Sequence, residues 1–275
     1  MEEVICLNGS LLPRSRAKIS VKDRGFLYGE GLFETLHVYN NKAVLLEDHL
    51  ARLLKSAQYL NLSLPCSRKE LVKLVENTIE VNRGSEGILR IILSGGCEKP
   101  QLLITYQHGL PYRQENYRKG ISAVISSIRR NPYSPVTKIK SLSFLDNILA
   151  REEARQQGAL EGIMLNVNGF VAEGTMSNFF LVKQEQVITP DLNSGILPGI
   201  TRATVLRLAA ALGLPVEERQ VELGEIFEAD ECFLTNALMG VMPLVEVNGR
   251  KVGNGDAPGK ITSLLLQQYR DKILS

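Results

Sequence analysis

The sequence lacks most of the residues and patterns that mark the commonest catalytic and metal-binding sites. Its 275 residues include no tryptophan and only three histidines, His37, His49 and His108, none in a nucleophile or metal-binding motif. The four cysteines are scattered, without CxxC spacing and without a histidine nearby, so we expect neither a metal site nor a disulfide framework. No GxSxG pattern occurs, which excludes the nucleophile elbow of the α/β-hydrolases.

Long apolar runs and charge of one sign are also missing. No stretch approaches the roughly 18 apolar residues of a membrane helix, and the first residues are acidic where a signal peptide would be apolar. Lys and Arg number 32 against 30 Asp and Glu, a net charge of +2, and no basic tract with interleaved aromatics favours nucleic acid. We therefore expect a cytoplasmic protein without membrane or nucleic-acid partners, and unpaired cysteines fit that reducing compartment.

What is present is the composition of a folded protein with a sizeable core, 44% hydrophobic and 23% charged. Strands cluster through hairpin signals such as Asn168-Gly169, and helical patterns lie between the clusters. The best-marked helix is expected over 67–81, where Ser67 and Glu70 can form a capping box. This order predicts an α+β fold with two domains. The expected boundaries are a small α/β domain over 1–112, a polar linker over 113–120 and a larger α/β domain over 121–275.

Lys140 differs from the other basic residues because apolar neighbours flank it, in Ile139-Lys140-Ser141-Leu142, before a helix expected over about 143–156. Partial burial and a positive helix end nearby would both favour the neutral amine, which is the nucleophile that a Schiff base requires. On its own the pattern is weak, because a lysine before a helix is most often a solvated surface residue. Lys138 satisfies the same reasoning equally well.

Five segments, taken together and in order, resemble the fold-type IV family of pyridoxal-phosphate enzymes. This family includes branched-chain aminotransferases, D-amino-acid aminotransferases and 4-amino-4-deoxychorismate lyases, and the pattern is most similar to the lyases. Any one segment is modest support, whereas the ordered set is highly specific. The segments are Asp23-Arg24-Gly25-Phe26-Leu27-Tyr28-Gly29-Glu30-Gly31-Leu32-Phe33-Glu34-Thr35, His49-Leu50-Ala51-Arg52-Leu53, Lys140-Ser141-Leu142-Ser143-Phe144-Leu145-Asp146-Asn147, Glu173-Gly174-Thr175-Met176-Ser177-Asn178-Phe179 and Leu197-Pro198-Gly199-Ile200-Thr201-Arg202.

The resemblance implies a two-domain fold like that of the D-amino-acid aminotransferases, with pyridoxal 5′-phosphate as cofactor. Lys140 matches the lysine that binds the cofactor covalently, Glu173 the acid that pairs with its ring nitrogen, and Arg52 the arginine that binds its phosphate. The resemblance also implies a homodimer, with Tyr28 acting across the subunit boundary. The other implied cofactor-binding residues are Ser177, Asn178, Ile200, Thr201, Ala237 and Leu238, of which Ile200 and Thr201 would offer N–H groups at a helix start.

The motifs leave the reaction open between a lyase and an aminotransferase. Thr35 stands where the family's lyases carry threonine, and the loop around Asn236-Ala237 is similar to the lyase version. Both favour aminodeoxychorismate lyase, which converts 4-amino-4-deoxychorismate to 4-aminobenzoate and pyruvate, with Thr35 as a catalytic residue. The loop over 94–100, however, lacks the Arg-Gly-Tyr of some lyases and the carboxylate trap of standard D-amino-acid aminotransferases. A D-amino-acid or branched-chain aminotransferase is therefore the alternative.

No motif identifies the residue that binds the carboxylate of the amino-acid-like substrate. Arg24, Arg90 and Lys99 are candidates on charge alone, and Tyr28 is expected to join Arg24 and Arg90 in binding the substrate. A hypothesis of a different class is a non-catalytic cofactor carrier on the same fold, because fold does not determine function. The presence of the matching lysine, acid and arginine weighs against a carrier.

Overall fold

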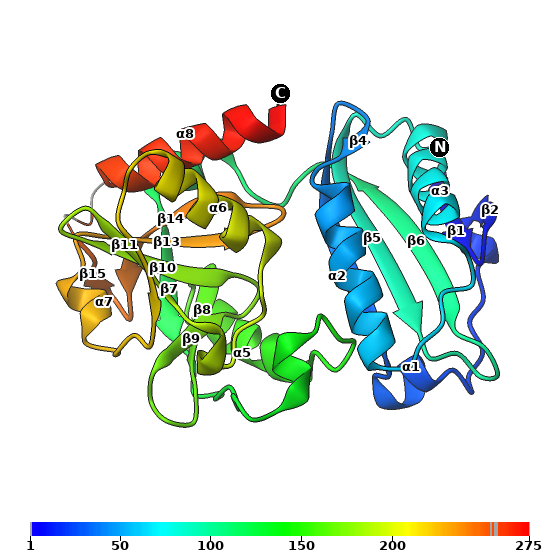
Figure 1. Ribbon diagram of the computed structural model, residues 1–275, viewed down its shortest axis with the longest axis horizontal. Helices are drawn as coiled ribbons and strands as arrows, with labels where there is room; N and C mark the ends of the chain where they lie inside the picture. Colours follow the sequence, from blue (N-terminus) through cyan, green and yellow to red (C-terminus); the bar gives the residue numbers. More distant parts are fainter. Residues whose placement is uncertain (1, 254, 256–257, 275) are drawn as a thin grey trace. The chain divides into compact units, whose positions relative to one another are not determined.

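The structure is a computed structural model that describes residues 2–253, 255 and 258–274 (Figure 1). The chain divides into two compact units, the first formed by Met1–Pro111 with Ile139–Phe144, and the second by Tyr112–Lys138 with Leu145–Ser275. Each unit has a hydrophobic core of its own, so each is described by itself.

This division differs from the expected boundaries in two places. Residues 113–120, expected as a linker, contain helix α4 (Gln114–Lys119) and belong to the second unit. Ile139–Phe144 belongs to the first unit, because the Phe33 N–H donates a hydrogen bond to the Lys140 carbonyl at 2.9 Å. Backbone pairing between segments so distant in sequence leaves no mark on composition, so the sequence could not predict it.

The first unit is a six-stranded antiparallel sheet with two long helices on one face. Its elements are β1 (Val4–Leu7), β2 (Ser10–Pro13), η1 (Arg14–Arg16), α1 (Arg24–Tyr28), β3 (Gly31–Tyr39), β4 (Lys42–Ala43), α2 (Leu46–Tyr59), α3 (Arg68–Val81), β5 (Glu86–Ser94) and β6 (Gln101–His108). The strands lie in the order β2-β1-β6-β5-β3-β4. Helix α2 contacts β3 and α3 contacts β6, and the view in Figure 1 draws β5 and β6 between the two helices.

The core of the first unit follows from two periodicities. Leu50 and Leu53 lie on one face of α2, and Leu32 and Leu36 alternate along β3 to meet them. Helix α3 begins with the predicted capping box, in which the Glu70 carboxylate accepts from the N-cap serine N–H at 2.8 Å. The face of the sheet that carries the intervening residues of β3 points away from these helices.

The second unit contains a nine-stranded mixed sheet that closes on itself. Its elements are α4, β7 (Ile121–Ile125), η2 (Pro135–Lys138), α5 (Leu145–Gln156), β8 (Glu161–Leu165), β9 (Val171–Gly174), β10 (Asn178–Lys183), β11 (Gln186–Pro190), η3 (Leu192–Ser194), α6 (Ile200–Ala211), β12 (Val216–Arg219), α7 (Glu225–Glu228), β13 (Glu231–Asn236), β14 (Gly240–Val247), β15 (Arg250–Lys251) and α8 (Lys260–Leu274). The strands lie in the order β12-β11-β10-β13-β14-β7-β8-β9, with β15 on β14. Strand β9 also pairs with β10 through Glu173 and Asn178, which closes the ring of strands.

Alternate side chains of the central strands divide between two apolar clusters in the second unit. Phe179 and Leu234 belong to one cluster, and Phe180 and Phe233 belong to the other, where their rings stack with centroids 4.7 Å apart. Helices α6 and α8 pack on the second cluster and lie side by side over β13 and β14 (Figure 1). Burial on both faces explains why these strands are almost continuously apolar.

Candidate active site

Lys140 lies on the face of the first unit's sheet that α2 and α3 do not cover. Its amine is 4.4 Å from the centroid of the Phe33 ring and 5.9 Å from that of Phe144. Phe33 alternates with the core residue Leu32 along β3, so its ring projects from the face opposite the helices. Lys140 is half-buried and Lys138 is exposed, so the two lysines that the sequence could not separate differ in their surroundings.

The helix expected over about 143–156 is present as α5 (Leu145–Gln156), but Lys140 does not lie at its start. Helix α5 begins only at Leu145, and Lys140 lies in an extended stretch in which Ser141 forms a bridge with Leu32. Aromatic rings, rather than the start of a helix, therefore surround the amine. The segment pairs with a strand because its apolar residues are buried there. Tertiary contacts, and not helix propensity, determine this conformation.

Thr35 and Arg90 share this uncovered face. They are partners in the register of β3 and β5, and the Arg90 guanidinium carbon is 5.7 Å from the Phe33 ring centroid. The Lys140 amine and the Arg90 guanidinium therefore both lie close to the Phe33 ring. Among the residues that the structure describes, Arg90 forms no ion pair with an acid, so its charge is available to an anionic ligand.

Helix α1 carries the other two residues expected to bind substrate. The Arg24 guanidinium is paired with the Glu30 carboxylate at 2.6 Å, so its charge is already compensated. Tyr28 is exposed at the end of the helix. Gly29 follows in the left-handed region, with φ of 69°, and its carbonyl accepts from the Ser143 hydroxyl at 3.3 Å. Helix α1 thus ends against the segment that contains the candidate lysine.

Arg52 is held by a buried carboxylate on the helix-covered face. Glu34 accepts from Arg52 Nε at 2.8 Å and Nη2 at 2.7 Å, and His49 Nδ1 lies 2.7 Å from the same carboxylate. Burial by itself raises the pKa of Glu34, but the Arg52 charge and the hydrogen bonds from Arg52 and His49 outweigh it and lower the pKa to about 2. Burial also lowers the pKa of His49, so the cluster consists of a carboxylate, a guanidinium and a neutral imidazole.

Glu34 and His49 were missed by the sequence reasoning, although both lie in motifs that carry the resemblance. The alternation along β3 could have identified Glu34, because it falls on the same face as Leu32 and Leu36. A carboxylate on an apolar face needs partners. The arginine one helix away is the natural partner, but only the packing of α2 on β3 shows that it lies within reach.

In the second unit, Glu173 lies where β9 and β10 close the ring. Its carboxylate is buried and accepts from the Leu197 N–H at 3.0 Å, from Asn178 Nδ2 at 3.3 Å and from Arg130 Nη2 at 2.6 Å. Asn178 also donates to the Leu197 carbonyl at 2.9 Å. The structure thus brings together two expected residues, Glu173 and Asn178. It adds Arg130, which the sequence reasoning missed because this residue lies outside the five segments that carry the resemblance.

The start of helix α6 adjoins this pair. A Cβ on its N-cap residue, Gly199, would lie 1.9 Å from Asn178 Oδ1, so the close approach requires glycine. No side chain of the N-cap residue caps the helix, so the N–H groups of Ile200 and Thr201 and the helix dipole could bind an anion. The Thr201 hydroxyl hydrogen-bonds the buried Tyr269, and this bond opposes the rise that burial causes in the pKa of Tyr269.

The loop between β13 and β14 carries Ala237 and Leu238. The Asn236 side chain organises this loop, because its Oδ1 accepts from the Leu238 N–H at 2.9 Å and its Nδ2 donates to the Met176 carbonyl at 3.0 Å. The Leu238 N–H is therefore already hydrogen-bonded. A role for it in binding a phosphate would require that bond to be shared or exchanged.

Ser177 is also engaged within the protein. Its hydroxyl donates to the buried Glu161 carboxylate at 3.0 Å, and the N–H groups of Thr175 and Met176 donate to the same carboxylate at 3.1 and 3.4 Å. A serine hydroxyl has one proton to donate, and here Glu161 accepts it. Ser177 thus shapes the turn between β9 and β10, and Glu161 is a further residue that the sequence reasoning missed.

One polar atom beside Asn178 is left without a partner. Thr235 is the register partner of Asn178 across β10 and β13, and its hydroxyl oxygen is buried with no hydrogen-bond partner among the described residues. A buried hydroxyl left unpaired costs free energy. The second unit therefore offers a buried carboxylate, an uncapped helix start and an unused hydroxyl. These groups fit a ligand that carries a ring nitrogen and a phosphate.

Comparisons with known proteins identify the family. The family described as amino-transferase class IV matches residues 31–247. The chain belongs to this family. It is 31% identical to D-alanine aminotransferase of Bacillus licheniformis, over 98% of this chain and 97% of the relative. It is also 31% identical to aminodeoxychorismate lyase of Bacillus subtilis, over 98% of this chain and 94% of the relative. The crystal structure of the Escherichia coli branched-chain amino acid aminotransferase superimposes with a TM-score of 0.94 and 28% identity, covering 99% of this chain and 95% of that one.

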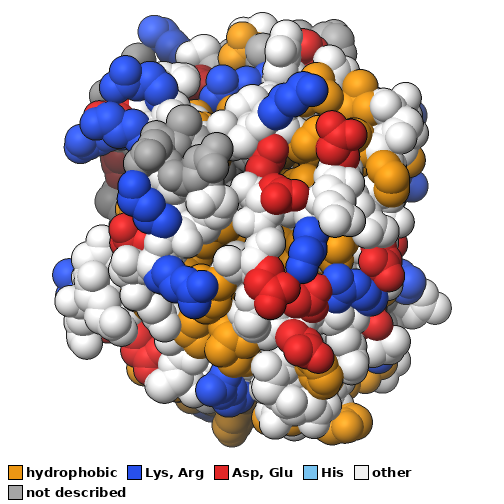
Figure 2. All heavy atoms as spheres, turned by 90° about the vertical axis from the view of Figure 1, so that its left-hand side faces the viewer, with side chains coloured by type: hydrophobic (Ala, Val, Ile, Leu, Met, Phe, Trp, Pro, Cys, Tyr) orange, Lys and Arg blue, Asp and Glu red, His pale blue; other side chains and the backbone are white. Residues whose placement is uncertain are grey.

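The predicted family and the α+β two-domain fold are therefore confirmed, and the chain is a class IV enzyme. Class IV enzymes depend in general on pyridoxal phosphate. The relatives are named for different reactions, so the family does not determine the substrate. No described helix is long and apolar enough to cross a membrane. Acidic and basic side chains are interspersed on the face drawn in Figure 2.

Proposed function

We propose that this chain binds pyridoxal 5′-phosphate and releases pyruvate from 4-amino-4-deoxychorismate, leaving 4-aminobenzoate. In this proposal Lys140 binds the cofactor covalently, Arg52 binds its phosphate together with the start of α6, and Glu173 pairs with its ring nitrogen. When bound, the cofactor supplies an electron sink for negative charge that develops on the substrate. The buried carboxylate and the uncapped helix start of the second unit support these assignments.

The position of Thr35 favours a lyase over an aminotransferase. Thr35 projects from the same face of β3 as Phe33, over which the Lys140 amine lies. Elimination requires a proton to leave a ring carbon as pyruvate departs, and the Thr35 hydroxyl is suited to help Lys140 move that proton. Arg90 would bind a substrate carboxylate through its guanidinium fork.

Arg90 is better suited to that role than Arg24. The Arg24 guanidinium already pairs with Glu30 at 2.6 Å, whereas Arg90 has no acidic partner among the described residues and lies over the same ring as Lys140. We expect Arg90→Lys, which keeps the charge and removes the fork, to raise KM more than it lowers kcat. Arg24→Lys is the matched control and should leave KM nearly unchanged.

Amino transfer to a keto acid is the second candidate. The D-alanine aminotransferase relative is as similar to this chain as the lyase relative, at 31% identity each. In amino transfer Lys140 could move the proton without a hydroxyl partner, so Thr35 would matter less. The carrier hypothesis is weakened by membership in an enzyme family.

A side-by-side assay tests the reaction. Purified protein would be assayed for 4-aminobenzoate release and for amino transfer from D-amino acids and branched-chain amino acids. Thr35→Val keeps the shape of the side chain and removes its hydroxyl, so we expect lyase turnover to fall by about 10- to 1,000-fold and amino transfer to change far less. Amino transfer by the wild type without any release of 4-aminobenzoate would overturn the lyase proposal in favour of the second candidate.

Borohydride reduction tests the cofactor assignment. The purified protein should be yellow, and reduction should fix the cofactor on Lys140 as an adduct that mass spectrometry can locate. Lys138→Ala is the matched control and should still form the adduct. An adduct on Lys138 would show that the assignment is wrong, and no adduct on either lysine would remove the cofactor from the proposal.

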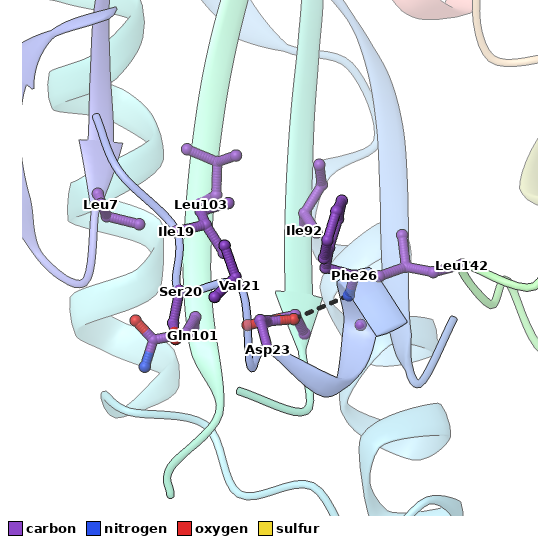
Figure 3. Close-up of a pocket in the computed structure, with 12 residues that line it drawn as sticks. Leu7, Ile19, Ser20, Val21, Asp23, Phe26, Ile92, Gln101, Leu103 and Leu142 are labelled. Atoms are coloured by element: carbon purple, nitrogen blue, oxygen red, sulfur yellow. Dashed lines mark hydrogen bonds between the residues drawn. The ribbon is translucent and has the colours of Figure 1, made fainter. Parts of the chain in front are cut away.

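We also propose that the working unit is a homodimer. Val21 and Phe26 are 76% and 73% exposed, and with Ile19, Ile92 and Leu103 they line a cavity of about 390 Å³ (Figure 3). An exposed apolar patch of this kind is typical of subunit contacts, and a second copy of the chain would cover it. Light scattering should give a dimer, and Phe26→Asp should weaken it. A fully active monomer would contradict the proposal.

A further inference from the structure

Arg130 contacts Glu173 but lies outside the residues proposed to bind the cofactor. Its Nη2 is 2.6 Å from Glu173 Oε1, and the two side chains are only 12% and 5% exposed. Its Nη1 donates to Asn147 Oδ1 at 3.3 Å. The pair is therefore a buried ion pair, in which the loss of one partner would leave an uncompensated charge.

The protein fixes Arg130 at both ends. The Arg130 N–H donates to the Leu165 carbonyl and its own carbonyl accepts from the Val167 N–H, both at 2.9 Å, just beyond the end of β8. At the other end, Asn147 donates from Nδ2 to the Thr175 carbonyl at 2.7 Å, so the group that binds the guanidinium is itself held. A side chain anchored in this way is preorganised to orient its partner.

The partners of Glu173 divide between its two oxygens. Arg130 binds Oε1, whereas the Leu197 N–H and Asn178 Nδ2 bind Oε2. Rotation of the carboxylate would break bonds on both sides, so its plane is set by these neighbours. A buried carboxylate without a cationic partner favours its neutral form, and a neutral acid cannot stabilise the protonated nitrogen of a pyridine ring.

On the basis of the proposed function, we infer that Arg130 is a positioning residue for the cofactor's ring nitrogen. It acts through Glu173, which it keeps ionised and oriented, and needs no contact with the cofactor or the substrate. The effect of Arg130 should therefore depend on whether the cofactor has a ring nitrogen. A residue that only stabilised the fold would act equally on any cofactor.

The 1-deaza analogue of the cofactor, in which C–H replaces the ring nitrogen, separates these possibilities. Full-length protein would be loaded with the cofactor or the analogue. After dilution, the absorbance would be used to follow dissociation of the bound compound. We expect Arg130→Met to weaken binding of the cofactor by about 10- to 100-fold and of the analogue by less than about threefold, from the usual worth of hydrogen bonds to charged groups. Arg130→Lys, which keeps the charge, should recover part of the loss. Arg155→Met is the matched control, because Arg155 forms an exposed pair with Glu152.

Equal weakening of the cofactor and the analogue, or unchanged binding of the cofactor, would overturn the inference. If Arg130→Met does not fold, the double variant Arg130→Met with Glu173→Gln leaves no unpaired buried charge and is compared with Glu173→Gln alone. Equal cofactor dissociation from these two proteins supports the inference, and faster dissociation from the double variant refutes it. A wild type that binds neither cofactor nor analogue would instead overturn the proposed function, and this inference with it.

Discussion

Two buried carboxylates, Glu34 in the first unit and Glu161 in the second, are stabilised differently. In the first unit Glu34 pairs with the Arg52 guanidinium and His49. In the second unit Glu161 accepts from the N–H and hydroxyl of Thr175 and from the Ser177 hydroxyl. Among the described residues Glu161 forms no ion pair with a basic side chain. A buried ion pair is costly to break at one partner, whereas hydrogen bonds from neutral donors are individually weaker.

The difference reflects what each carboxylate holds in place. Glu34 orients Arg52, a long and flexible side chain on the neighbouring helix, and a charged fork suits that purpose. Glu161 organises the backbone of a tight turn, which in turn places Glu173 opposite Asn178 at the closure of the ring. Backbone N–H groups are the donors that such a turn presents, so no cation is needed there.

The largest expected effect is the loss of one partner of the ion pair in the first unit. Arg52→Ala leaves the Glu34 carboxylate buried without its guanidinium, and we expect the free energy of unfolding to fall by about 3–5 kcal/mol. Urea unfolding of the cofactor-free protein would measure it. The double variant Arg52→Met with Glu34→Gln removes both charges and should recover most of the loss. An Arg52→Ala variant as stable as the wild type would remove the contrast between the two carboxylates.

The next effect is a dependence of stability on pH that belongs to the first unit. The folded pKa of Glu34, about 2, lies below its ordinary value of 4.5. Its stabilisation is therefore complete above pH 4.5 and is lost as the pH falls towards 2, by about 3 kcal/mol in total. The lowered pKa of His49 acts in the same direction below its ordinary value of 6.5.

Urea unfolding at several pH values would measure this dependence. Between pH 7 and pH 3 the wild type should lose more stability than Glu34→Gln, in which the carboxylate cannot titrate. If the free energy of unfolding had the same slope against pH in the two proteins, Glu34 would not have the lowered pKa assigned to it.

The smallest expected effect is in the second unit. Ser177→Ala removes one donor from Glu161 and leaves the backbone donors of the turn in place, so we expect a loss of about 1 kcal/mol of stability and no change in cofactor affinity. Ser63→Ala, at an exposed position, is the control. A clear loss of cofactor affinity without a loss of stability would instead support the cofactor-binding role that the resemblance implies for Ser177.

Local features of this protein could be predicted where the residues that cause them are close in sequence. The capping box at Ser67 formed as expected, and strands β8 and β9 pair around the Asn168-Gly169 turn. The family could be recognised for a related reason, because each motif is a short contiguous string. The helix expected after Lys140 formed as α5, whereas the extended stretch at Lys140 itself could not be predicted, because β3, which is distant in sequence, provides its hydrogen bonds.

The sequence by itself determined the family, the α+β class and the residues matched to the cofactor, because these depend on short motifs and on the spacing of apolar residues. Only the tertiary structure decided which charged groups meet. Glu34 reaches Arg52 because α2 packs on β3, and Arg130 reaches Glu173 because both adjoin the closure of the ring. Ion pairs and hydrogen bonds act over a few ångströms. Residues distant in sequence come within that range only after the chain has packed.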